Sequence, residues 1–143
     1  MKKVFALALA IVMIFSAIPV TVFAAESVTT ISTAAQLAAI ANDLSGNYKL
    51  TDDIDLSDYG AWTPIGGSTA FSGTFEGNNK KITGLTVNTS SQYGGLFGNV
   101  SGTVKNLNLT NVDASGYGYV GGLVGSAENS SEIVNCSANG NIY

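Results

Sequence analysis

Clustered acidic side chains are the first residues in this sequence whose types and spacing could support chemistry. Four aspartates lie within seven positions: Asp52, Asp53, Asp55 and Asp58. Calcium takes several oxygen ligands, so a cluster of this kind could hold a calcium ion. The spacing lacks the glycine and the distal glutamate of an EF-hand loop, and it differs from the glycine-aspartate nonapeptide of calcium-binding β-rolls. The pattern favours an ordinary acidic strand and turn with no metal, and calcium binding stays open as the alternative.

Scattered carboxylates could also serve glycoside hydrolysis, which uses two acids on either side of the scissile bond. The candidates are spread over separate loops: Glu76, Asp113, Glu128 and Glu132. A polysaccharide lyase would additionally need a base and cations, and beyond the first residues the sequence offers four lysines: Lys49, Lys80, Lys81 and Lys105. The chain contains no histidine and no arginine. We therefore predict a non-catalytic protein without a cofactor, with a carbohydrate-active enzyme as the alternative.

Aromatic side chains in the longer predicted loops are candidates for partner binding. Tyr59, Trp62, Tyr117 and Tyr119 could stack on sugar rings or anchor a protein partner. For Trp62 we favour a structural role, covering the apolar core near its start, with partner contact as the alternative. The predicted partner is an extracellular protein or a glycan, and the sequence does not choose between them.

The N-terminus predicts export. A positive start at Lys2 and Lys3 precedes an apolar run, Pro19 breaks that run, and a small-residue cleavage pattern ends at Ala24. We expect a signal peptide over residues 1–24, cleaved after Ala24, and no other contact with a membrane. An uncleaved anchor is the alternative, because the apolar stretch as far as Ala25 is nearly long enough to span a bilayer.

Charge and cysteine usage exclude further classes. Loss of the two lysines in residues 1–24 would change the net charge from −4 to −6. Such an acidic chain lacks the basic surface that nucleic acids require. Cys136 is the only cysteine, so no internal disulfide can form. We expect it to pack as a small core residue.

One segment, after a spacer over residues 25–31, has the pattern of a helix. Thr33 and Gln36 fit a capping box, with Ser32 as a competing N-cap, and Gly46 fits a left-handed C-cap. Apolar residues recur on one face at i, i+3, i+4 and i+7: Leu37, Ile40, Ala41 and Leu44. The sequence predicts a short helix within residues 32–46.

Residues 47–143 consist of short stretches of alternating apolar residues separated by turn residues. Two glycine-flanked pentapeptides recur within them: Gly94, Gly95, Leu96 and Gly98, then Gly121, Gly122, Leu123 and Gly125. Glycine suits points where the chain turns sharply or packs closely on a neighbouring coil. These pentapeptides are therefore predicted to be architectural, and a repeat of this length built from short strands indicates a solenoid.

Three units can be aligned, at offsets of 22 and then 29 residues. The alignment predicts about three coils. Equivalent residues should stack inside them as four rungs: Phe75/Leu96/Leu123, Ile82/Val104/Ile133, Leu85/Leu107/Cys136 and Val87/Leu109/Ala138.

These repeats carry a family resemblance. GGLFG and GGLVG, each followed by a strand, resemble the GLUG motif of bacterial surface proteins, and the stretches from LAAIANDLSG to FSGTFEGNNKKITGLTV resemble the segment that often precedes it. The resemblance covers about residues 32–143. It implies an all-β, right-handed parallel β-helix in secreted or wall-attached, adhesin-like proteins. Some members are IgA-specific metallopeptidases, but this chain has no histidine for their H-E-x-x-H zinc site.

The resemblance implies an adhesion, stalk or ligand-display module, or the non-catalytic repeat region of a larger surface enzyme. The helix within residues 32–46 should cap the first coil, since an open solenoid end exposes unpaired strand edges. The chain reaches Asn141, Ile142 and Tyr143 inside a strand pattern. We therefore expect a β-helix truncated at its C-terminal end, with self-association through that open end. No anchoring module is recognised.

Overall fold

The computed structural model describes residues 19, 21–22 and 24–143. The predicted signal peptide over residues 1–24 lies almost wholly outside these residues. None of the helices in the described part of the chain has the length and apolar character needed to cross a bilayer.

Most of the regular structure in the described chain consists of short strands. The helical part consists of α1 (Ala34–Ala39) and the 3-10 turn η1 (Ile40–Asn42). The strands are β1 (Val28–Ile31), β2 (Asn47–Leu50), β3 (Ile54–Asp55), β4 (Thr74–Glu76), β5 (Lys81–Thr83), β6 (Thr86–Thr89), β7 (Tyr93–Gly94), β8 (Phe97–Val100), β9 (Thr103–Lys105), β10 (Asn108–Gly116), β11 (Tyr119–Val120), β12 (Val124–Ala127), β13 (Glu132–Val134) and β14 (Ser137–Ile142).

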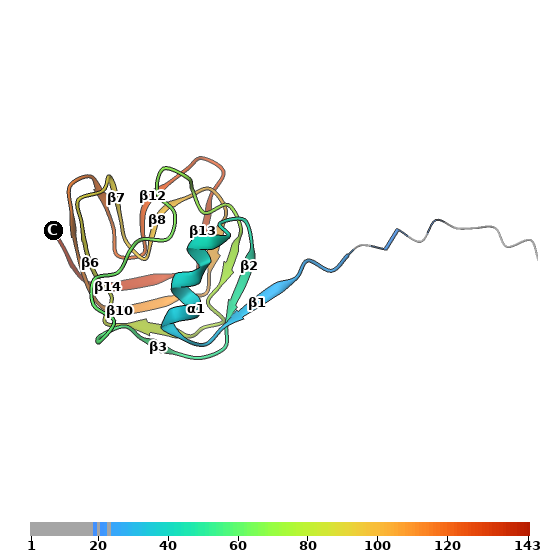
Figure 1. Ribbon diagram of the computed structural model, residues 1–143, viewed down its shortest axis with the longest axis horizontal. Coiled ribbons are helices and arrows are strands. Elements are labelled where there is room, and N and C mark those ends of the chain that lie inside the picture. The colour runs from blue at the N-terminus through green and yellow to red at the C-terminus, as the bar shows by residue number, and fades with distance from the viewer. Residues whose placement is uncertain (1–18, 20, 23) are drawn as a thin grey trace, which may run out of the picture.

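The strands form parallel ladders between successive turns of a coil (Figure 1). One sheet has the order β1-β2-β4-β9-β13, a second has the order β14-β10-β5-β3 with β6 also paired to β10, and the pairs β11-β7 and β12-β8 complete the coil. This is a parallel β-solenoid of about four turns. The predicted all-β solenoid fold is confirmed.

The first coil accounts for the fourth turn. Strand β2 pairs in parallel with β4, and Ile65 forms a bridge with Phe97 of the next coil. Residues from Asn47 onward therefore make a complete turn of their own. The prediction of about three coils was one short because this turn lacks the glycine pentapeptide that marks the later ones.

The predicted rungs are correct between the last two coils and wrong for the coil before them. Phe75 pairs with Val104 rather than lying level with Leu96, and Ile82 pairs with Leu109 rather than with Val104. The glycines around Phe75 suggested the wrong match, because glycine occurs at several corners of each coil. Backbone hydrogen bonds between neighbouring strands decide the register instead.

Between the last two coils the predicted rungs hold. Val104 pairs with Ile133, and Leu109 pairs with Ala138. Equivalent strands therefore lie one above the other at the inter-strand spacing of about 4.8 Å.

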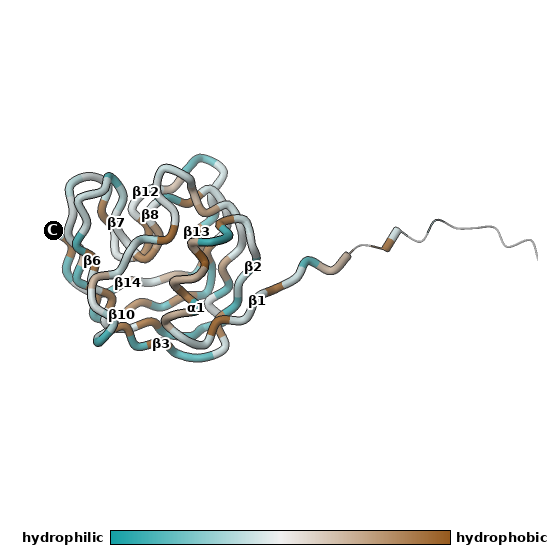
Figure 2. The backbone as a smooth tube through the Cα atoms, viewed as in Figure 1, coloured by the Kyte–Doolittle hydropathy of each residue, from teal (hydrophilic) through white to brown (hydrophobic). Residues whose placement is uncertain are grey.

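Apolar side chains fill the inside of the coil, and the hydrophobic segments of the chain gather there (Figure 2). Three fully buried phenylalanines form the centre of the core. The ring of Phe97 lies 5.2 Å from that of Phe71 and 5.4 Å from that of Phe75. Each coil can bury these side chains only against its neighbours, so the stacking of the repeats is what forms the hydrophobic core.

The helix begins as predicted and ends earlier. The Thr33 hydroxyl accepts a hydrogen bond from the Gln36 backbone at 3.2 Å, and the Gln36 side chain accepts one from the Ser32 backbone at 2.8 Å. Both candidate cap residues therefore take part. Leu37 and Ile40 of the predicted apolar face are buried in the core cluster.

Gly46 is not the helix C-cap, contrary to the prediction. The regular helix ends at η1, and Gly46 is absent from the residues with positive φ. The Asp43 carboxylate instead accepts hydrogen bonds from the Ser45 backbone at 3.1 Å and the Ser45 hydroxyl at 2.8 Å. This local side-chain turn replaces the glycine cap.

Candidate functional site

The glycine pentapeptides stack on one another as architecture. Phe97 pairs with Val124, and Asn99 pairs with Ser126, so Gly98 and Gly125 lie level in adjacent coils. A Cβ atom on Gly125 would lie 2.6 Å from the Tyr119 carbonyl oxygen and 2.8 Å from that of Gly98. Only glycine allows the two backbones to approach this closely.

A stacked pair of tyrosines lies beside these glycines. Tyr119 on β11 pairs with Tyr93 on β7, and their rings are 5.8 Å apart at an angle of 16°. Tyr119 is 56% exposed, and the neighbouring Tyr117 is 89% exposed. The sequence reasoning missed Tyr93, although its place directly before GGLFG matches that of Tyr119 shortly before GGLVG.

The other two predicted aromatic residues lie together near the first coil. Trp62 is only 3% exposed, and its indole Nε1 donates a hydrogen bond to the Leu96 carbonyl oxygen at 3.0 Å. The ring of Tyr59 lies 5.3 Å from the indole and remains partly exposed. Trp62 thus covers the core, and partner contact through these two residues stays a prediction.

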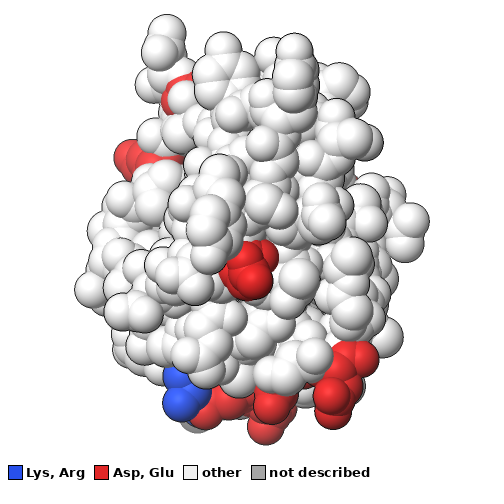
Figure 3. All heavy atoms as spheres, turned by 90° about the vertical axis from the view of Figure 1, so that its left-hand side faces the viewer, with Lys and Arg blue, Asp and Glu red and all other residues white. Residues whose placement is uncertain are grey.

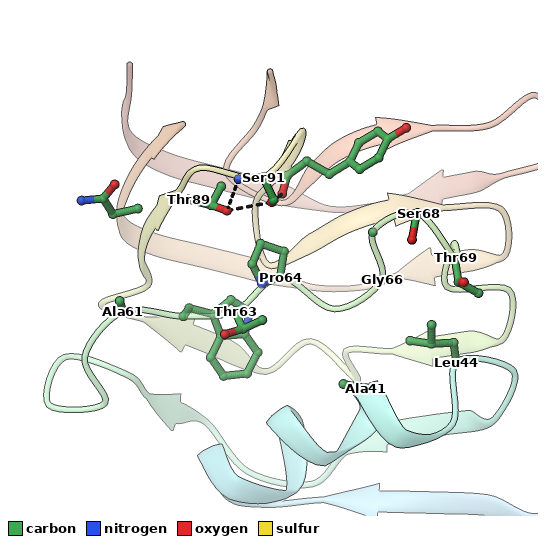
Figure 4. A pocket seen from close by; sticks show the side chains of 14 residues that line it. Ala41, Leu44, Ala61, Thr63, Pro64, Gly66, Ser68, Thr69, Thr89 and Ser91 are labelled. Atoms are coloured by element: carbon green, nitrogen blue, oxygen red, sulfur yellow. Dashed lines mark hydrogen bonds between the residues drawn. The ribbon is translucent and has the colours of Figure 1, made fainter. Parts of the chain in front are cut away.

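A hollow of about 460 Å³ opens between the end of the helical segment, the loop over residues 61–69 and the turn over residues 88–93. Figure 4 shows Ala41 and Leu44 on one side and Thr89 and Ser91 on the other, with Thr63 between them. Trp62 and Tyr93 also line it, so each of the two aromatic pairs described above contributes one residue to the lining. Its lining contains no charged side chain.

The predicted acidic cluster does not come together as a metal site. Asp53 accepts a hydrogen bond from the Lys81 backbone at 2.8 Å, and Asp52 accepts one from the Thr51 hydroxyl at 2.9 Å. Within residues 24–143, no group of three or more histidine, cysteine or acidic side chains is placed to hold a metal ion.

Asp55 likewise stabilises the turn that follows it. Its carboxylate accepts a hydrogen bond from the Ser57 backbone at 2.9 Å. Hydrogen bonds from Ser57 lower the pKa of Asp55. Asp58 of the same cluster is exposed.

Glu76 is held by a network on the outer surface of the coil. Its carboxylate accepts hydrogen bonds from the Asn106 amide at 3.0 Å and from the Asn78 backbone at 2.6 Å, and Lys105 lies 3.6 Å away. Partial burial acts to raise the pKa of Glu76, but these hydrogen bonds and the lysine charge outweigh it and lower the pKa. These contacts give the Glu76 carboxylate a structural role between adjacent coils.

The side of the molecule that carries β6 and the C-terminus is largely neutral. Figure 3 shows acidic side chains gathered mainly along its lower edge, with little basic surface. This agrees with the composition and offers no surface for a polyanion.

Comparison with known proteins places part of the chain in a recognised motif. The family model described as the GLUG motif matches residues 116–143, and the predicted resemblance to GLUG-motif proteins is confirmed. The chain is also similar to halomucin of Haloquadratum walsbyi, with 33% identity over 134 residues. That alignment covers 82% of this chain and spans about 1% of the length of halomucin. No solved structure matches the chain.

Proposed function

We propose that this GLUG-motif β-solenoid is a secreted or cell-surface, non-catalytic module that presents its loops to an extracellular protein or glycan. The observation that carries the proposal is the stacked pair Tyr93 and Tyr119 beside the exposed Tyr117. Aromatic rings held at a fixed spacing offer contact area at little entropic cost, which suits recognition of a partner.

The roles of the repeated residues and of the acidic residues support a non-catalytic function. The repeated residues are apolar or glycine and build the scaffold. Two of the four acidic residues that could serve hydrolysis, by contrast, take part in structural contacts. Glu76 accepts hydrogen bonds from Asn106, and Glu128 accepts one from Asn99 at 2.9 Å. Neither is left as a free acid.

Export is supported by the sequence pattern over residues 1–24 and by the similarity to halomucin. The GLUG resemblance implies secreted or wall-attached proteins of the same kind. The full chain, expressed with an epitope tag, should be accessible to antibody outside intact cells. A variant lacking residues 2–24 should remain inside, and equal labelling of the two would contradict export.

Partner binding is tested with a glycan array and a matrix-protein pull-down. The wild type is compared with a Tyr117→Ala/Tyr119→Ala variant, and Tyr143→Ala provides a matched control because Tyr143 is also exposed. Loss of binding in the double variant alone would support the proposal. Absence of binding to both panels would contradict it.

The competing proposal, a carbohydrate-active enzyme, requires turnover. Incubation with pectin, alginate and glycan panels, followed by product analysis, tests for it. Cleavage that Glu76→Gln or Asp113→Asn abolishes would overturn the non-catalytic proposal.

A further inference from the structure

The hollow beside the helix has the size of a small-molecule site. Its volume of about 460 Å³ lies within the range of about 300–1,000 Å³ found for ligand pockets. Its residues come from three separate segments: the end of the helical segment, the loop over residues 61–69 and the turn over residues 88–93. Figure 4 shows that these segments surround a common space.

Hydroxyl groups supply most of its hydrogen-bonding capacity. Thr63, Ser68 and Thr69 line the hollow and are exposed. Thr89 and Ser91, across the hollow, are already joined by a hydrogen bond of 2.7 Å between their hydroxyl oxygens. Each hydroxyl can both donate and accept, so this lining can pair with a ligand whose groups do the same.

The apolar part of the lining combines three small aliphatic side chains with three ring side chains: Ala41, Leu44 and Ala61, and Trp62, Pro64 and Tyr93. The Trp62 indole is 3% exposed and donates a hydrogen bond to the Leu96 carbonyl, so it supports the lining without offering a face to a ligand. Pro64 lies next to it in the loop. Tyr93 lines the hollow, is partly exposed, and stacks its ring on Tyr119. The negative face of an aromatic ring attracts the weakly positive C–H groups of an apolar ligand face.

Backbone contacts hold the loop in place before any ligand arrives. The Trp62 amide donates to the Thr86 carbonyl at 2.7 Å, the Ile65 amide to Leu96 at 3.0 Å, and the Phe71 amide to Asn99 at 2.9 Å. Gly66 has a φ of 75°, and a Cβ there would lie 2.8 Å from the Asn99 carbonyl oxygen. A loop anchored in this way loses little entropy on binding.

We propose that this hollow binds an uncharged sugar residue of an extracellular glycan. This inference rests on the proposed function and assigns the ligand class. A sugar presents hydroxyls that donate and accept, together with an apolar C–H face, and both match the lining. Because no charged side chain lines the hollow, the carboxylate of an acidic sugar would lose hydration and find hydroxyl donors but no cation to offset the loss.

Titration of the full chain tests the assignment. The probes are the neutral trisaccharides mannotriose, galactotriose and N-acetylchitotriose, and the acidic sugars trigalacturonic acid and sialyllactose, followed by NMR chemical shifts or calorimetry. We expect at least one neutral probe to bind with a dissociation constant of about 1 mM or below, and the acidic probes to bind at least tenfold more weakly.

A shape-conserving variant tests the site itself. Thr63→Val/Thr69→Val removes two hydroxyls while keeping branched side chains, and we expect at least fivefold weaker binding. Thr86→Val is the matched control, since Thr86 is exposed on β6 and does not line the hollow. Its affinity should stay at the wild-type value, and unchanged circular dichroism should show that both variants fold.

Three outcomes would overturn the assignment: no neutral probe binds, acidic probes bind better, or the double threonine variant binds like the wild type. Glycan binding that depends on Tyr117 and Tyr119 but not on Thr63 and Thr69 would overturn the hollow as the site and leave the proposed function standing. Absence of glycan and protein binding altogether would count against both.

Discussion

The two ends of the solenoid have similar apolar residues and very different burial. At the first coil, Leu37 and Ile40 of the helical segment are buried in the core cluster together with Tyr48 of β2. At the last coil, Ile133 is 40% exposed and Ile142 is 46% exposed. The difference shows that a side chain in this fold is buried when a neighbouring coil or helix covers it, whatever its residue type.

A single rung shows the same effect. Phe75, Val104 and Ile133 pair in succession along β4, β9 and β13. The first two are fully buried because each has a neighbour on both sides, whereas Ile133 has one only within the described chain. Equal side chains should therefore make unequal contributions to stability along the coil.

The largest expected difference is between two identical substitutions. Ile82→Ala should lower the free energy of unfolding by about 2–5 kcal/mol, because the side chain is fully buried between two coils. Ile133→Ala should cost less than about 1 kcal/mol, because much of that side chain already contacts water. Chemical denaturation of the two variants measures both values, and equal losses would contradict the comparison.

A protein that consists of residues 25–143 alone should self-associate through its last coil. The strand edge and apolar residues there should pair with a second copy of the chain. Ile133→Lys/Ile142→Lys should raise the concentration for half-association at least about tenfold, equivalent to about 1.4 kcal/mol, as measured by analytical ultracentrifugation. Val28→Lys on the edge strand β1 is the control at the other end. A larger effect of Val28→Lys would reverse the assignment.

The asparagine stack offers a finer comparison between the last two coils. Asn106 and Asn135 both have positive φ, at 56° and 51°, and the Asn135 amide donates to the Asn106 side chain at 2.8 Å. Glycine keeps this backbone conformation and removes the side-chain bonds. Asn106→Gly should cost about 1 kcal/mol because it also loses the contacts to Glu76.

Asn135→Gly is the matched variant in the last coil. It loses one exposed hydrogen bond, so its cost should be smaller, at about 0.5 kcal/mol. Thermal melting of the two variants compares them. An equal or larger loss of stability for Asn135→Gly would contradict the larger contribution assigned to Asn106.

The smallest expected effect is a change in acid sensitivity. The pKa of Glu76 is lowered in the folded chain, so its ionised form stabilises the fold above the ordinary pKa of a glutamate. That contribution is lost as the pH falls through the lowered value. Glu76→Gln should therefore reduce stability at neutral pH, and its difference from wild type should shrink on acidification. A difference that grows in acid would contradict this sign.

Sequence reasoning worked best where a local pattern has a local cause. Thr33 begins the helix as predicted because its hydroxyl binds a backbone group only three residues away. Tyr117, and Tyr119 on the short strand β11, are exposed as expected for a segment rich in glycine. The rung from Val104 to Ile133 was also found, because both strands follow a similar glycine pentapeptide.

Sequence reasoning failed where the structure depends on pairing between segments far apart in the chain. The register of Phe75 depends on which strand of the next coil accepts its backbone hydrogen bonds, and no pattern within the strand itself records that choice. The hollow was missed for the same reason. Thr63, Ser68 and Thr89 are ordinary polar residues in separate turns until the coil brings them together.

By itself, then, the sequence determined that short strands with buried alternate residues repeat along the chain, because alternation and glycine spacing act through nearest neighbours. Only the tertiary structure decided the number of turns and the pairing of Phe75. These depend on backbone hydrogen bonds between coils and on which side chains the next layer covers. That layer comes from residues about one coil away, so its effect cannot be derived from any single segment.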